Sequence, residues 1–256
     1  MIASVVVVGL GEVGGPLLTL VSKAHPGAVG VDVEPVALPP RGSVDVMHIC
    51  FPFDIDDFIG EAARYIDLVA PRLTVINSTV AVGTTRAVHE RIGAPIAYSP
   101  VRGKHVRMLD DLTCYVKFVG GIDEDAGQDA ARHLQSLGMR TRVLPTSEAA
   151  ELAKLSETTY FGLLIAWAQE VERYCDKFGV DYDDVVAFFE EIGYLPPAPF
   201  FPGVIGGHCV MPNIEILRGL LDSELLDAIR SSNEQKIARE AARGDVPEAL
   251  GTGAAL

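Results

Sequence analysis

The chain opens on an apolar run that leads directly into a glycine-rich turn. Residues 4–9 read SVVVVG, and a continuous β-branched run of this kind is typical of a strand buried on both faces. The turn over 9–14 reads GLGEVG, and residues 12–23 then follow a helical pattern. A strand, a GxGxxG turn and a helix in this order begin a dinucleotide-binding βαβ unit.

Each glycine of the turn has a physical task in that unit. Gly9 permits the tight turn, Gly11 lets a pyrophosphate approach the backbone, and Gly14 lets helix and strand pack closely. The helix start, with Glu12 and Val13, offers free N–H groups and a partial positive charge to phosphates. The turn is therefore a predicted phosphate site.

The second strand, predicted over 27–33, brings Asp32 to the same edge. Its carboxylate would accept hydrogen bonds from the adenosine ribose hydroxyls and repel a 2′-phosphate, and Glu34 adds to that repulsion. NAD is therefore the predicted cofactor, in preference to NADP. The alternative is a purely structural glycine turn in a flavodoxin-like domain.

Strands and helices alternate up to Pro145. Further strands are expected at 45–51, 73–78, 95–98, 114–120 and 140–144, and helices at 56–70, 84–92 and 124–137. This alternation predicts an α/β domain over 1–145, a Rossmann-type doubly wound parallel sheet with helices on both faces.

After Pro145 the pattern becomes helical. Helices are expected at 147–178, 182–192 and 214–242. The last two are separated by a loop over 193–213 that is rich in glycine and proline. We expect a smaller all-helical domain over 146–243, joined by the long helix, and a disordered tail over 244–256. Apolar residues along 147–178 need a partner, which favours a homodimer through this helix.

Charge and cysteine usage exclude some classes of function. The formal net charge of −14 argues against a nucleic-acid binder, and no long apolar run suggests a membrane span. The four cysteines form no CxxC pair, so we expect no metal site, and a cytoplasmic location is the default. Cys50, Cys114 and Cys175 lie in apolar segments and are expected in the core.

One basic cluster stands out in this acidic chain. It follows Ser99-Pro100 and contains Arg102, Lys104, His105 and Arg107. It would bind a phosphate or carboxylate of an anionic small-molecule substrate. The alternative is that the cluster belongs to a solvated loop or contacts a second subunit.

Several further segments carry a resemblance to a known family. They are INSTV at 76–80, GTTR at 83–86, YSP at 98–100, AELAKL at 150–155, the pair Gln169-Glu170, and PGVIGGHC at 202–209. Together with the glycine turn, they make residues 3–240 resemble the UDP-glucose/GDP-mannose dehydrogenase family.

The resemblance implies oxidation of a sugar-nucleotide CH2OH group to a carboxylate, with two hydrides passing to NAD. It implies that Cys209 is the nucleophile, through a thiohemiacetal and then a thioester. Lys154 would stabilise oxyanions, and Thr79 would place the catalytic water. A thiolate is a strong nucleophile and a lysine in a pocket can stabilise an alkoxide, which suits these roles. Plainer alternatives are a solvated helix residue for Lys154 and a passive small hydrophobe for Cys209.

Neighbouring residues complete the expected site. Ser78 is assigned to cofactor binding. The residues assigned to the substrate side are Arg102, Lys104, Gly206, Gly207, His208 and Asn213. The two glycines would let ligand and backbone approach closely, and His208 would form part of the pocket wall.

The chain departs from the family at three motif positions. Thr158 stands where the family has Asn, Asn213 where it has Asp, and Val101 where it has Glu. The family's C-terminal nucleotide-binding domain is also expected to be missing. These departures leave two alternatives open: a two-electron dehydrogenase of the β-hydroxyacid type, with Lys154 as acid/base and Cys209 incidental, or a non-catalytic NAD-binding module.

Overall fold

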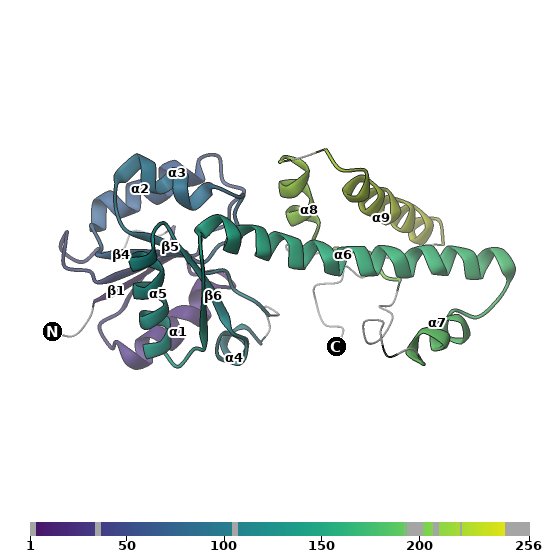
Figure 1. Cartoon of the computed structure of the whole chain (residues 1–256), viewed down its shortest axis with the longest axis horizontal. Coiled ribbons are helices and arrows are strands. Elements are labelled where there is room, and N and C mark those ends of the chain that lie inside the picture. The colour runs from purple at the N-terminus through teal and green to yellow at the C-terminus, as the bar shows by residue number, and fades with distance from the viewer. Residues whose placement is uncertain are drawn as a thin grey trace. The chain divides into compact units, whose positions relative to one another are not determined.

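The computed structural model describes residues 4–33, 37–103, 107–191, 193, 202–206, 210–220 and 222–243. The chain divides into two compact units, Met1–Lys154 and Leu155–Leu256. The first is an α/β unit and the second is helical, and the long helix α6 (Ser147–Phe178) contributes to both (Figure 1). None of the described helices is long and apolar enough to cross a membrane.

The first unit is built on one sheet. Its strands are β1 (Val5–Val8), β2 (Val29–Val31), β3 (Val46–Ile49), β4 (Leu73–Ile76), β5 (Ile96–Tyr98), β6 (Lys117–Gly121) and β7 (Thr141–Leu144). Its helices are α1 (Gly14–Ala24), α2 (Phe58–Val69), α3 (Thr84–Ile92), α4 (Met108–Cys114) and α5 (Glu124–Ser136). The described strands lie in the order β2-β1-β3-β4-β5-β6-β7 and are parallel except for the β5–β6 pair.

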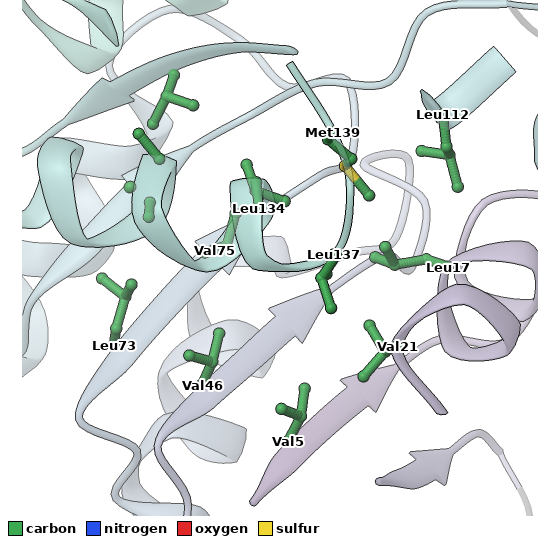
Figure 2. Packing of buried hydrophobic residues seen from close by; sticks show 14 of the residues in the cluster. Val5, Leu17, Val21, Val46, Leu73, Val75, Leu112, Leu134, Leu137 and Met139 are labelled. Atoms are coloured by element: carbon green, nitrogen blue, oxygen red, sulfur yellow. The ribbon is translucent and has the colours of Figure 1, made fainter. Parts of the chain in front are cut away.

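Two apolar layers cover the faces of this sheet. On one face Val5, Val46 and Val75 pack against Leu17 of α1 and Leu134 of α5, as Figure 2 shows. The other face packs against α2 and α3 and receives Ala150 from the first turn of α6. The central strands β1, β3 and β4 are therefore buried on both sides, as the unbroken valine run of β1 predicts. The predicted α/β fold is confirmed.

A polar cluster is buried inside the first of these layers. The His48 ring on β3 is fully buried, and its Nε2 lies 2.9 Å from Nε2 of His133 on α5. Asn77 Nδ2 lies 3.1 Å from His48 Nδ1. Burial lowers the pKa of His133 to about 4, with His25 contributing, and lowers that of His48 well below its usual value. Both rings are therefore neutral in the folded protein at neutral pH.

This histidine pair makes stability fall in mild acid. Below pH 6.5 His133 is protonated in the unfolded chain but stays neutral in the folded chain. The free energy of unfolding therefore decreases as pH falls from 6.5 towards about 4. Between pH 7.5 and 5.0 His133 alone should lower the free energy of unfolding by about 2 kcal/mol. Urea titrations at the two pH values measure this loss. His133→Gln should reduce this loss, whereas the control His89→Gln on α3 should not. Equal losses in the wild type and both variants would contradict the assignment of the loss to His133.

The second unit is helical. Beyond α6 it contains α7 (Tyr182–Glu190), α8 (Val210–Arg218) and α9 (Glu224–Arg243). One apolar cluster joins α6, α8 and α9 through Ile165, Ile214 and Ile229, and a second joins α6 and α7 through Cys175 and Val186.

Four sequence expectations are corrected here. The stretch 214–242 is not one helix, because the chain turns at Gly219 between α8 and α9. The segment 114–120 does not begin as a strand, since α4 runs to Cys114. β6 runs antiparallel to β5, so the sheet is only mostly parallel. Cys114, at the end of α4, is exposed and not in the core, whereas Cys175 is buried.

Candidate functional site

The candidate cofactor site lies at the carboxyl end of the sheet in the first unit. The chain leaves β1 for β2 on one side and returns to β3 on the other, so the strand order reverses at β1. Open α/β sheets bind ligands in the crevice at such a switch point. The glycine turn follows β1 directly, and Asp32 follows β2.

The three motif glycines have different surroundings. Gly9 has φ +86°, and a Cβ there would lie 2.5 Å from Phe51 N. At Gly14 a Cβ would lie 1.7 Å from Gly9 O, so only glycine lets α1 start against the strand. At Gly11 a Cβ would meet no protein atom within 4 Å. The first and third glycines are therefore needed by the fold, while the second faces open space that fits an approaching ligand.

The start of α1 has features that suit an anion. Asp57 and Asp123 cap α2 and α5 through their carboxylates, whereas α1, which begins after Val13, has no side-chain cap and no acidic residue in its first turn. Its terminal N–H groups and positive dipole end suit the phosphates of a dinucleotide. Glu12 is exposed beside it.

Asp32 lies at the end of β2 with an exposed side chain. Its Oδ2 accepts a hydrogen bond from Leu10 N at 3.3 Å, and its Oδ1 accepts one from Val33 N at 3.0 Å. The carboxylate thus lies beside the glycine turn. This position suits hydrogen bonds to ribose hydroxyls of a nucleotide whose phosphates lie at the start of α1.

The loop after β4 lines the same edge of the sheet. Ser78 is buried, and its hydroxyl donates to Phe51 O at 2.6 Å, which ties the ends of β3 and β4 together. Thr79 is half-buried, and Val80 after it is fully buried. The structure therefore brings Ser78 and Thr79 to the strand edge that carries the glycine turn.

Lys154 lies on α6 and is half-buried. One turn earlier on the helix, Glu151 is fully buried and accepts hydrogen bonds from Gly83 N at 2.7 Å and from the Thr85 amide and hydroxyl at 2.9 and 2.7 Å. The first turn of α6 is thus attached to the N-terminus of α3. From the sequence, Glu151 is an acidic residue that suits the helix dipole, and it is not assigned to the site because its partners are far away in the sequence.

A second buried charge supports the segment after β5. Lys117 is 3% exposed, and its ammonium donates to the carbonyls of Ser99 and Pro100, both at 2.8 Å. Burial lowers the pKa of Lys117 to about 7, opposed by Cys50 and aided by the charge of Lys154. Sequence reasoning missed Lys117. Its signal was a lysine inside the apolar strand pattern YVKFV.

The basic cluster is only partly described. The Arg102 guanidinium lies 5.8 and 5.7 Å from the centres of the Tyr115 and Phe118 rings, which is within cation–π range. Val101 is half-buried against the core beneath α4 and α5. Lys104 and His105 lie outside the described residues.

In the second unit the glycine-rich segment is held by two buried amides. Gln169 Nε2 donates to Gly203 O at 2.6 Å, and Asn233 exchanges hydrogen bonds with the Ile205 backbone at 2.7 and 2.9 Å. Gly206 is half-buried at the end of this segment, and the predicted residues Gly207, His208 and Cys209 lie outside the described part of the chain. Asn233 was another missed residue, since it lies in a polar helix stretch without a motif.

Two positions that depart from the family motifs are buried in the second unit. Asn213 on α8 is 3% exposed, and its Nδ2 has no hydrogen-bond partner among the described residues. Thr158 on α6 is 8% exposed. Neither position carries the polar group that the resemblance leads one to expect. No group of three or more His, Cys, Asp or Glu side chains in the described ranges could hold a metal ion.

Comparisons with known proteins agree with this architecture. Residues 148–235 match the model of the UDP-glucose/GDP-mannose dehydrogenase family, central domain. A UDP-N-acetyl-D-mannosamine dehydrogenase of Methanococcus maripaludis is 30% identical over 143 residues, which is 54% of this chain and 33% of the relative. The chain thus spans only about a third of that relative's length.

Solved structures show the same fold. UDP-D-ManNAc dehydrogenase of Pyrococcus horikoshii superposes with a TM-score of 0.81 at 21% identity, over 93% of this chain and 70% of that one. The 3-hydroxyisobutyrate dehydrogenase of Mycobacterium tuberculosis gives 0.69 at 20% identity, over 96% of each chain.

The family model covers the helix that carries Lys154, the Gln169 contact and the glycine-rich segment. Three of the segments that indicated the resemblance therefore lie in the matched region, namely 150–155, Gln169-Glu170 and 202–209. Residues 148–235 of this chain are thus similar to the central domain of the UDP-glucose/GDP-mannose dehydrogenase family.

Proposed function

We propose that this protein is an NAD-dependent dehydrogenase that oxidises the primary alcohol of a sugar nucleotide or a related phosphorylated sugar. One observation carries the proposal: a unit with a dinucleotide cradle leads, without a break, into the family-matched helix that bears Lys154. In this reading residues 1–145 form the cofactor domain and residues 146–243 the helical domain.

The cofactor would be held by groups already described. The α1 N-terminus and the space beside Gly11 would take the pyrophosphate, and Asp32 would take the adenosine ribose. When bound, NAD accepts hydride from the carbon that is oxidised. The fixed negative charge of Asp32 disfavours the 2′-phosphate of NADP.

The remaining steps fall to side chains of this chain. Lys154 would stabilise the negative charge that develops on the substrate oxygen, and Thr79 would orient the water. By resemblance, loss of a first hydride to NAD would convert the alcohol to an aldehyde, and the thiol of Cys209 would add to it and form a thiohemiacetal. Loss of a second hydride, to another NAD, would give a thioester, which water cleaves to the acid and the free thiol.

A second candidate is a two-electron dehydrogenase of the β-hydroxyacid type. It is favoured by the full-length match, 96% of both chains, with 3-hydroxyisobutyrate dehydrogenase. It is also favoured by Thr158, Asn213 and Val101, which lack the groups expected for the four-electron reaction. In that case Lys154 is the acid/base and Cys209 has no chemical role.

Counting NADH per substrate separates these candidates. The protein is incubated with NAD and a panel of UDP-, GDP- and dTDP-sugars, with 3-hydroxy acids in parallel. About two NADH per sugar nucleotide support the proposal, and about one per substrate supports the second candidate. NAD binding without any turnover would refute both and leave a non-catalytic NAD-binding module.

We also propose that the protein forms a homodimer through α6. Three aromatic residues on this helix, Tyr160, Trp167 and Tyr174, are each about half exposed and recur every seventh residue. This spacing puts them along one face of a helix. Beside Trp167 a groove of about 340 Å³ between α6 and α9 is lined mainly by apolar side chains. A second copy would cover this stripe and keep it from water.

The only tryptophan of the chain reports on this contact. On dilution, Trp167 emission should shift to longer wavelength as the dimer dissociates, at concentrations where sedimentation shows the change in mass. Tyr160→Glu should raise the dissociation constant by about tenfold or more. Gln128→Glu on α5 adds the same charge and should have no effect. A monomer at all concentrations would overturn the proposal.

A further inference from the structure

The buried carboxylate of Glu151 lies at a junction between two segments of the candidate site. Its oxygens accept hydrogen bonds from Gly83 N at 2.7 Å, Thr85 N at 2.9 Å and Thr85 Oγ1 at 2.7 Å, and its side chain is fully buried. Gly83 and Thr85 flank the first residue of α3. Glu151 therefore caps α3 from a distant part of the chain.

These contacts fix Glu151 more narrowly than apolar packing would. A buried carboxylate is costly unless donors satisfy both oxygens, so the geometry has to be kept within hydrogen-bond distance. The positive end of the α3 dipole adds to the attraction. A second, more exposed link runs parallel to the first: Glu148 Oε1 lies 2.5 Å from Arg86 Nε.

Both segments joined by Glu151 carry residues of the proposed chemistry. Lys154 lies three residues further along α6, so the two side chains lie on adjacent positions of the same helix. On the other side, the chain from Gly83 back to Thr79 is short and passes through the fully buried Val80. A movement of Glu151 would therefore change the distance between Lys154 and the loop of Ser78 and Thr79.

We propose that Glu151 is a positioning residue, which sets Lys154 relative to the Ser78–Thr79 loop by capping α3. The inference rests on the proposed function, because it gives Lys154 and Thr79 their roles. It differs from that function in assigning work to a carboxylate that touches neither substrate nor cofactor. It also explains why an acidic residue lies in the apolar environment at the start of α6.

Glu151→Gln in the full chain tests this role. The amide keeps the size of the side chain but places an N–H group against the donors of Gly83 and Thr85, so one hydrogen bond is replaced by a repulsion. We expect kcat to fall by about tenfold or more, with KM for the substrate and the NAD dissociation constant changed less than about twofold. Thr85→Val should give a smaller fall, and Thr85→Ser, which keeps the hydroxyl, should restore activity.

The matched control is Glu148→Gln, which removes the negative charge from the parallel but more exposed link to Arg86. It should lower kcat much less than Glu151→Gln. If both variants keep the wild-type kcat while only Glu151→Gln melts earlier, the carboxylate is merely structural and the inference is wrong.

A readout without turnover separates this inference from the proposed function. Amine labelling of Lys154, followed by mass spectrometry, measures the surroundings of the lysine directly. Its rate should change severalfold in Glu151→Gln and stay unchanged in Glu148→Gln. An inactive wild-type protein with this labelling pattern would refute the function but keep the positioning. Equal labelling of all three proteins would overturn the positioning itself.

Discussion

Alanine in place of Lys154 should lower kcat with a sugar-nucleotide substrate by about 10³-fold, while the NAD dissociation constant changes by less than about twofold. The ammonium is the cation that the proposal places at the developing oxyanion. The dinucleotide cradle, in contrast, is built from β1, α1 and β2 and does not include this residue. Steady-state kinetics and a calorimetric NAD titration measure the two quantities.

Cys209→Ser is the companion variant that separates the two catalytic readings. If the reaction proceeds through a thioester, the serine variant should lose the second NADH and release little acid. If the protein is a two-electron dehydrogenase, Cys209→Ser should turn over like wild type while Lys154→Ala stays inactive. Full activity of Lys154→Ala would contradict both readings.

Alanine at Gly14 should damage folding and cofactor binding together. Its Cβ would lie 1.7 Å from the carbonyl oxygen of Gly9, so α1 would have to move away from the strand end. We expect a loss of about 3 kcal/mol in the free energy of unfolding, together with at least about tenfold weaker NAD binding. Urea unfolding and NAD titration measure the two effects.

Gly11→Ala is the informative contrast to Gly14→Ala. A Cβ at Gly11 would meet no protein atom within 4 Å, so stability should stay within about 0.5 kcal/mol of wild type. NAD binding should nevertheless weaken, because the methyl group would occupy the space assigned to the pyrophosphate. Gly27→Ala, also in open space but in the turn before β2, should change neither quantity. Unaltered NAD binding in Gly11→Ala would place the pyrophosphate elsewhere.

The sequence predicts local structure well where a strong periodic signal exists. The valine run of β1, the glycine turn and the limits of α6 at 147–178 follow from patterns within a few neighbouring residues. The predictions were wrong where an element was short or where its apolar pattern ran into that of the next element. α4 has only seven residues, too few for a clear period, and its end merges with the apolar pattern of β6.

Long-range partners could not be predicted for a different reason. The direction of β6 depends on how the chain returns to the sheet, and strand composition carries no sign of it. The acceptor role of Glu151 depends on Gly83 and Thr85, which lie 68 and 66 residues away. The glycine turn could be assigned because all its parts are neighbours in the chain. The surroundings of Lys154 could be found only in the folded structure.

The lysine buried at position 117 has a consequence for redesign of the protein. The Lys117 ammonium on β6 donates to two successive carbonyls, those of Ser99 and Pro100. The loop after β5 therefore depends on a donor from a different strand. A grafted loop after β5 must therefore present its first two carbonyl oxygens to Lys117. Otherwise the Lys117 ammonium would be buried without hydrogen-bond acceptors. A change at position 117 likewise needs a matching change in the loop, so the two sites cannot be optimised separately. Libraries aimed at substrate preference should randomise them together.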